Sequence, residues 1–185
     1  MSRSFRSRKL FVVVFTLLLA VALGLAAGDK YAVKVPGGLA ISEFRGYEDW
    51  ATISMSRGEK VVAVIVGNPA MIEAYRSGFP GNGKPAPDGA KMAKLHWAPK
   101  PNEYFPTATV PGQLLNIDFM VKDSKRFADS GGWGYAVFDY DAASNTFAPG
   151  TLAGMPPQGN DAKCGAACHT AAKSRDYVFT DYGRR

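Results

Sequence analysis

The sequence predicts an α+β domain built on a mainly antiparallel β-sheet with short helices. Three stretches, at residues 60–67, 91–97 and 113–122, have the apolar runs or the two-residue alternation that are typical of β-strands. A fourth stretch, at 133–140, is rich in aromatic residues, which strands favour. Short loops and helical segments connect these stretches, and such connections favour an antiparallel sheet.

Residues 40–78 are expected to form a helix, a strand and a second helix. Residues 40–56 mix apolar and polar side chains at roughly helical spacing, so we predict a short amphipathic helix there. The run KVVAVIVG at 60–67 predicts a buried strand. In the following NPAMIEAYRSG, Asn68 suits the N-cap of a helix, Pro69 its first position and Gly78 the residue after its end.

Residues 79–97 predict a set of turns followed by a strand. The Gly- and Pro-rich FPGNGKPAPDGA at 79–90 is expected to form turns only. In the strand KMAKLHW, side chains alternate between two faces. One face carries Met92, Lys94 and His96, and the other carries Lys91, Ala93, Leu95 and Trp97.

The next strand, QLLNIDFMVK at 113–122, also has two distinct faces. One face is expected to carry Leu115, Ile117, Phe119 and Val121, and the other Asn116, Asp118 and Met120. Residues 123–130 predict one or two helical turns, capped by Asp123 or Ser124 and closed by a pair of glycines. Residues 141–163 show no periodicity and predict a long loop, and residues 163–173 have an Ala-rich, helical character.

The first 27 residues predict an export signal. They contain four basic residues and no acidic one near the start, and residues 10–27 are then uncharged and end in small side chains. Cleavage after Ala26 or Ala27 would leave residues 28–185 as one domain. An uncleaved membrane anchor is the alternative, because an 18-residue apolar run is at the lower limit for spanning a bilayer. In both cases the domain lies outside the cytoplasm.

The positive charge of the chain comes largely from this leader. The whole chain has a net charge of +6, but residues 28–185 contain 18 basic and 16 acidic residues, a net charge of +2. We therefore expect no nucleic-acid partner.

The segment KCGAACHTAAK at 163–173 carries the most specific chemical signal. It contains both cysteines, Cys164 and Cys168, and one of the two histidines, His169. Cys-x-x-Cys-His is the attachment motif of c-type haem, and here one additional residue separates the cysteines. Two thiols can add across the haem vinyl groups, and the histidine next to the second thiol can reach the iron. The segment therefore predicts one covalently attached haem near the C-terminus.

Two other interpretations of this segment stay open on spacing alone. Cysteines at positions i and i+4 of a helix can approach disulfide distance, although the geometry is demanding. A zinc site would need more ligands than the segment supplies, so His96 and a carboxylate would have to join from elsewhere in the chain.

The chain also resembles a known family in several longer stretches. These stretches are NPAMIEAYRSG, GNGKPAPDGAKMAKLHW, DFMVKDSKRFADSGGWGYAVFDYD, CGAACH and DYVFTDYG. Together they are similar to the cytochrome P460 family, from about residue 31 to the C-terminus. The resemblance implies a periplasmic mono-haem c-type protein, a homodimer, built on an antiparallel sheet.

The resemblance implies two functional branches. Cytochromes P460 proper oxidise hydroxylamine and carry a lysine bonded to the porphyrin edge, whereas the related cytochromes c′-beta lack that bond and bind nitric oxide. In both, the iron is five-coordinate with a histidine on one side, and electrons pass to an external acceptor. We expect hydroxylamine oxidation, with nitric-oxide binding or simple electron transfer as the alternatives.

The resemblance also assigns roles to individual residues. Cys164 and Cys168 match the thioether cysteines, and His169 matches the axial ligand. Lys94 matches the cross-linking lysine, with Lys91 as the runner-up. Asp118 stands near the place of a distal carboxylate that moves protons.

Three further residues have competing interpretations. His96 could be a second axial ligand, but a lone strand histidine is more often a partly buried core residue. Arg126 and Lys122 could neutralise the haem propionates, because guanidinium and ammonium groups pair with carboxylates. A solvated helix face is the simpler interpretation of these two cations.

Overall fold

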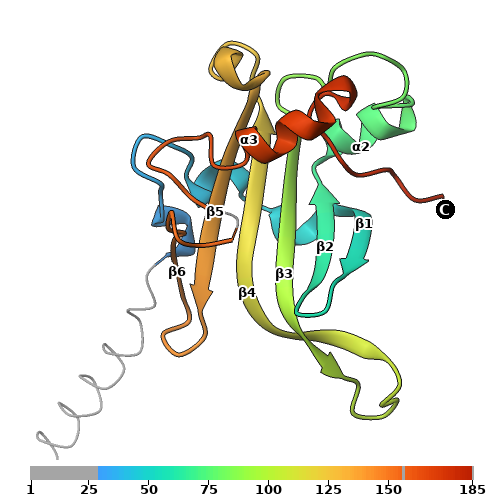
Figure 1. Ribbon diagram of the computed structural model, residues 1–185, viewed down its shortest axis with the longest axis vertical. Helices are drawn as coiled ribbons and strands as arrows, with labels where there is room; N and C mark the ends of the chain where they lie inside the picture. The colour runs from blue at the N-terminus through green and yellow to red at the C-terminus, as the bar shows by residue number, and fades with distance from the viewer. Residues whose placement is uncertain (1–28, 156, 185) are drawn as a thin grey trace, which may run out of the picture.

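The computed structural model describes residues 29–155 and 157–184 (Figure 1). The expected export signal at residues 1–27 lies outside the described residues. Within the described part, no helix has the length and apolar character needed to cross a membrane.

A six-stranded sheet forms the centre of the fold. Its strands are β1 (Ala51–Arg57), β2 (Val62–Gly67), β3 (Lys91–Pro101), β4 (Thr109–Lys122), β5 (Trp133–Asp141) and β6 (Thr146–Pro149). They lie side by side in sequence order, and every neighbouring pair is antiparallel. The predicted α+β class with a mainly antiparallel sheet is therefore confirmed.

The helices are short. They are α2 (Pro69–Arg76), α3 (Ala166–His169) and the 3-10 helices η1 (Lys30–Ala32), η2 (Ile41–Phe44), η3 (Tyr47–Asp49), η4 (Ala128–Ser130) and η5 (Thr170–Arg175). The start of α2 is as predicted, because the Asn68 side chain accepts a hydrogen bond from the backbone N–H of Met71 at 3.1 Å and Pro69 follows it.

The predicted helix at residues 40–56 is wrong. The segment forms η2 and η3 and then enters the edge strand β1. Gly46 has a φ of 84°, a left-handed conformation that ends any continuous helix between η2 and η3. The predicted loop at 141–163 also contains the short strand β6, which pairs with the end of β5.

Two apolar layers cover the two faces of the sheet. On one face, residues of η2 and the preceding loop pack on β4 and β5, and the rings of Phe44 and Phe119 stack with centroids 4.3 Å apart. On the other face, α2 and the C-terminal segment pack around Met92, Met120 and Tyr135. Figure 1 shows α3 and η5 crossing in front of one end of β3 and β4. Residues further along these strands, among them Lys94, His96 and Asp118, line a cavity, and we call this part of the sheet the open face.

The strand faces follow the predicted alternation, with one exception. The β3–β4 register pairs His96 with Asn116 but Trp97 with Leu114, so Leu115 is an extra residue in a β-bulge. Leu115 is 38% exposed and borders the open face instead of packing with Ile117 in the core.

Candidate functional site

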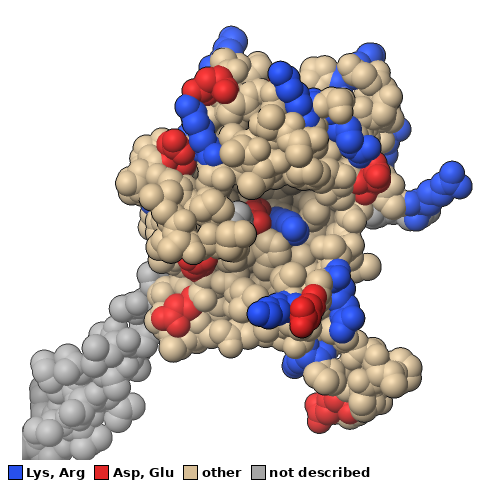
Figure 2. Space-filling view, viewed as in Figure 1, with Lys and Arg blue, Asp and Glu red and all other residues tan. Residues whose placement is uncertain are grey.

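A cavity of about 450 Å³ lies between the open sheet face and the C-terminal segment. Strands β2 to β5 supply one wall, and α3 together with the tail at residues 178–180 supplies the other. Figure 2 shows the hollow near the middle of the molecule, with basic and acidic atoms inside it. Lys94 and Asp118 are the lysine and the acidic residue in its lining.

Helix α3 brings the cysteine segment onto this cavity. The backbone N–H of Tyr135 on β5 donates to the carbonyl of Ala162 at 2.7 Å, which fixes the entry to the segment. A Cβ atom on Gly165 would lie 2.8 Å from the Tyr135 ring, so glycine allows the start of α3 to lie directly on β5. Cys164, Cys168 and His169 consequently all line the cavity.

A hydrogen bond to the backbone fixes the tautomer of the His169 ring. Its Nδ1 lies 2.6 Å from the backbone oxygen of Tyr177. Because a carbonyl oxygen only accepts, Nδ1 carries the proton and Nε2 carries the lone pair. Burial lowers the pKa of His169, which also favours the neutral ring. The rings of Tyr135 and Phe179 flank it, with centroids 4.9 and 5.1 Å away.

The two cysteines are free thiols in this structure, so the disulfide interpretation gains no support. Burial raises the pKa of the Cys164 thiol to about 12, and this thiol is therefore protonated at neutral pH. In the described part of the chain, no group of three or more His, Cys, Asp or Glu residues could hold a metal ion. The zinc interpretation therefore has no ligand set there.

Lys94 and Asp118 lie on the sheet wall of the cavity. They are directly opposite each other in the β3–β4 pairing, and both side chains line the cavity. Burial raises the pKa of Asp118 to about 7, and the nearby charge of Lys94 partly opposes this shift. Lys91 points to the other face, where its Nζ donates to the carbonyl of Glu43 at 2.5 Å. The structure thus places Lys94, and not Lys91, in the cavity.

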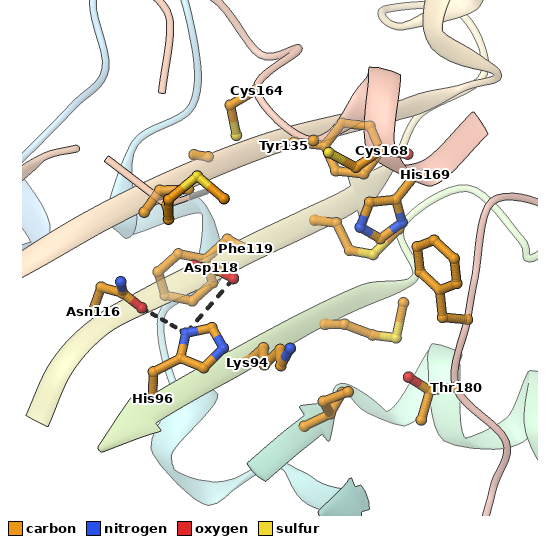
Figure 3. Close-up of a pocket in the computed structure, with 18 of the residues that line it drawn as sticks. Lys94, His96, Asn116, Asp118, Phe119, Tyr135, Cys164, Cys168, His169 and Thr180 are labelled. Carbon is orange, nitrogen blue, oxygen red and sulfur yellow. Dashed lines mark hydrogen bonds and ion pairs between the residues drawn. The ribbon is translucent and has the colours of Figure 1, made fainter. Parts of the chain in front are cut away.

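His96 also faces this cavity, close to Asp118. Its Nδ1 donates to the side-chain oxygen of Asn116 at 2.5 Å and lies 3.7 Å from a carboxylate oxygen of Asp118. Burial lowers the pKa of His96. Figure 3 shows His96 and His169 approaching the cavity from opposite sides, with Lys94 and Asp118 between them.

The structure places Lys122 and Arg126 elsewhere. Lys122 is only 5% exposed and pairs with Asp176, while Arg126 pairs with Glu43 at 2.6 Å. Neither residue lines the cavity. The interpretation that they neutralise haem propionates is therefore not supported. The favoured interpretation, a solvated face, fits the half-exposed Arg126 but not the buried Lys122.

A family model described as Cytochrome P460 matches residues 44–180, most of the chain. The chain belongs to the cytochrome P460 family. Proteins of this family are haem c proteins, so haem c is the cofactor, and Cys164 and Cys168 are consistent with its covalent attachment. No curated protein matches the chain.

The residues around the cavity fit the haem of a cytochrome P460. Two thiols and a neutral imidazole line the same space. Among the described residues, Asp118 Oδ1 and the Tyr135 hydroxyl are buried without a hydrogen-bond partner, although both residues line the cavity. Buried polar atoms normally have partners, and a bound group with polar atoms would be a source of partners for these two residues. Trp133 Nε1, outside the cavity, is also buried without a partner.

Several parts of this cytochrome P460 site depend on contacts between segments that are distant in the sequence. Asn116 was placed on the correct strand face, but its bond to His96 depends on the register of β3 and β4. Tyr135 lies in the aromatic strand at 133–140, and strand alternation alone does not show that α3 covers it. The tail at 178–180 belongs to the stretch DYVFTDYG that resembles the family, but its place on the cavity depends on a distant contact, since the Tyr75 hydroxyl donates to the carbonyl of Thr180 at 3.0 Å.

Proposed function

We propose that this chain is an exported haem c protein that oxidises hydroxylamine at a five-coordinate iron. One observation carries the proposal: Lys94 and Asp118 share a cavity with the neutral His169 ring. A lysine and a buried carboxylate on the wall facing an imidazole are the groups that the hydroxylamine-oxidising branch of the family implies.

Three residues of the C-terminal segment are proposed to hold the cofactor. Cys164 and Cys168 would form thioether bonds, and His169 would bind iron through Nε2. The bond from His169 Nδ1–H to the Tyr177 carbonyl makes the imidazole a stronger donor and fixes its orientation. When bound, the haem accepts electrons from the substrate and passes them to an external acceptor.

Lys94 is proposed to form the covalent bond to the porphyrin edge. The new N–C bond would replace one N–H of the amine and one C–H of the macrocycle, and a two-electron oxidant from outside the protein, such as a peroxide, would take up the two hydrogens. Its side chain projects from the middle of the sheet wall, between His96 and Met92 on the same strand face. A cysteine segment on one wall and Lys94 on the other would fix the macrocycle from two sides.

Asp118 is proposed to accept protons released from hydroxylamine. Its pKa is raised to about 7, so the carboxyl group can take up and release protons near neutral pH. The neighbouring His96 ring is a second group able to exchange a proton at the same place.

Nitric-oxide binding is the second candidate, and a specific observation favours it. Val61, Ile65 and Leu115 contribute apolar side chains to the same cavity, and such surroundings suit a small uncharged ligand. A sixth ligand from His96 would instead make the protein an electron carrier.

The location and partners belong to the same proposal. The leader at residues 1–27 and the family resemblance support a periplasmic protein, a homodimer and a periplasmic cytochrome as electron acceptor.

Hydroxylamine turnover with an artificial electron acceptor tests this proposal. The wild-type protein should reduce the acceptor, Lys94→Ala should lose most of the rate, and Lys91→Ala should keep it because Lys91 lies on the other sheet face. Tight nitric-oxide binding without hydroxylamine turnover in the wild type would favour the second candidate. A fully occupied, six-coordinate iron would favour the electron carrier.

A further inference from the structure

A buried ion pair lies behind the His169 wall of the cavity. Lys122, at the end of β4, donates from Nζ to Asp176 Oδ1 at 2.7 Å and to the carbonyl of Gly131 at 3.0 Å. Its ammonium group also lies 5.1 Å from the centre of the Trp133 ring. The side chains of Lys122 and Asp176 are only 6% and 14% exposed. Neither residue lines the cavity, so the proposed chemistry does not use them directly.

Asp176 uses both carboxylate oxygens to join distant parts of the chain. While Oδ1 binds Lys122, Oδ2 accepts from the backbone N–H of Ala86 at 2.8 Å. One carboxylate thereby ties the end of η5 to the end of β4 and to the loop at residues 79–90. Residues on two other segments, Lys122 and Ala86, consequently fix the position of the Asp176 side chain.

The backbone at this point has an unfavourable conformation. Asp176 and Tyr177 have φ values of 50° and 63°, so two successive non-glycine residues are left-handed. Such a conformation persists where the surrounding contacts hold it in place. Backbone hydrogen bonds close the turn, from the Asp176 N–H to the Lys173 carbonyl at 3.2 Å and from the Tyr177 N–H to the Ala172 carbonyl at 2.9 Å. The Asp176 side chain adds the bonds to Lys122 and to the Ala86 N–H, which fix the turn against β4 and the loop at residues 79–90.

This backbone presents the carbonyl that binds His169. The Tyr177 oxygen, one residue after Asp176, accepts from His169 Nδ1 at 2.6 Å. The Tyr177 ring packs against Gly131, where a Cβ atom would lie 2.1 Å from the ring. Gly131 is also the residue whose carbonyl binds Lys122. The ion pair and the histidine bond therefore meet through one short, tightly packed stretch of chain.

We propose that the Lys122–Asp176 ion pair is a positioning element for His169: it holds the left-handed turn that places the Tyr177 carbonyl against Nδ1. The inference rests on the proposed role of His169 as axial ligand. Lys122 acts through Asp176 and Tyr177 and does not touch the haem.

Loss of the ion pair should change the electron donation from His169 to the iron. A strong hydrogen bond from Nδ1–H makes the imidazole a better electron donor to the iron, which stabilises the ferric state. Without the ion pair the turn relaxes and the bond to the Tyr177 carbonyl weakens. The iron–histidine stretching frequency of the ferrous protein should then fall, and the reduction potential should shift to more positive values.

The experiment compares haem-loaded variants by resonance Raman spectroscopy and redox titration. Lys122→Met removes the ammonium group and keeps an apolar chain over Trp133. Asp176→Asn removes the charge and leaves a single acceptor oxygen, so it can keep the bond from Lys122 or the bond from the Ala86 N–H but not both. The double variant carries neither charge, so it tests the turn without leaving a buried charge unpaired. Asp181→Asn is the matched control, because it breaks an exposed ion pair with Arg175 in the same segment.

We expect a lower iron–histidine stretching frequency and a more positive reduction potential in both single variants and in the double variant. Asp181→Asn should keep the wild-type values of both. Folded, haem-loaded variants with the wild-type frequency and potential would overturn the inference while leaving His169 as the ligand. If a single variant fails to fold, the double variant decides in the same way.

A His169→Gly variant separates this inference from the proposed function. The iron–histidine band should be present in the wild type and lost in His169→Gly. If the wild type lacks the band, or if His169→Gly keeps it, His169 is not the ligand and the positioning role fails with it.

Discussion

Lys94 on β3 and Asp118 on β4 are cross-strand partners whose side chains enter the same cavity, facing the wall that carries His169. Opposite residues in an antiparallel pair are close neighbours, and this pair combines an amine with a carboxyl group that burial shifts toward neutrality. The sheet wall therefore presents an amine and a carboxyl group at directly opposite positions of two neighbouring strands.

The first prediction concerns a covalent bond at Lys94. If Lys94 is bonded to the porphyrin, the intact mass of the mature protein falls below the sum of protein and haem by the hydrogens lost, because thioether formation alone is an addition. Trypsin should also fail to cleave after Lys94. Lys94→Ala should restore the simple sum, whereas Lys91→Ala should keep the lower mass. An unchanged mass in Lys94→Ala would remove the cross-link.

The second prediction concerns the pH dependence of turnover. As a proton acceptor, Asp118 works in its ionised form, and its pKa is about 7. The rate of hydroxylamine oxidation should therefore rise with pH through about 7 and then level off. Asp118→Asn should lower the rate by about 100-fold or more, as is typical for loss of a general base. The rise near pH 7 should also vanish. A wild-type profile in this variant would show that another group carries the protons.

The same carboxyl group links stability to pH. The folded-state pKa of Asp118 lies above its ordinary value of 3.8, so the folded protein holds a proton that the unfolded chain releases. Its contribution to stability is present at low pH and declines as the pH rises from about 4 to about 7, by about 4 kcal/mol at most. Asp118→Asn should remove this decline. Urea unfolding of the wild type and of Asp118→Asn at pH 5 and pH 8 measures this decline in the free energy of unfolding. If the two proteins lose the same free energy between these pH values, the raised pKa of Asp118 is contradicted.

The fourth prediction concerns the buried ion pair. Lys122→Met leaves the Asp176 carboxylate buried without its cation, which should lower the free energy of unfolding by about 3–5 kcal/mol. Adding Asp176→Asn should recover part of this loss, because the unpaired charge is then gone. Denaturant unfolding of the two variants checks this order. A double variant that is less stable than Lys122→Met would contradict it.

The fifth prediction concerns haem attachment. Cys164→Ser and Cys168→Ser should each leave one thioether bond, which moves the pyridine haemochrome band to longer wavelength relative to the wild type. Because the proposed Lys94 bond would also hold the porphyrin, the double cysteine variant is made together with Lys94→Ala, and this triple variant should release its haem on acid extraction. Haem that stays covalently bound in the triple variant would contradict thioethers at Cys164 and Cys168.

Strand alternation made much of the sheet wall predictable. Because side chains alternate with a period of two, the run KMAKLHW was enough to place Lys94 and His96 together, and the next strand placed Asp118 on a single face. The cap at Asn68 was likewise visible, because it depends on local hydrogen bonds.

Features that depend on distant contacts were not predictable. The bulge at Leu115 depends on the pairing of two strands, and η2 and η3 form where a helix was expected because Gly46 interrupts the chain. The Tyr177 carbonyl is a backbone group and leaves no side-chain pattern. Its importance is visible only where a left-handed turn aims it at His169.

The absorption spectrum of the reduced, mature protein tests the central claim most directly. The protein should be made in cells that can attach c-type haem and measured without added ligand. We expect a broadened Soret band at longer wavelength than in ordinary c-type cytochromes, because a lysine bonded to the porphyrin edge alters the macrocycle. An ordinary high-spin c-type spectrum would contradict the Lys94 cross-link and favour nitric-oxide binding.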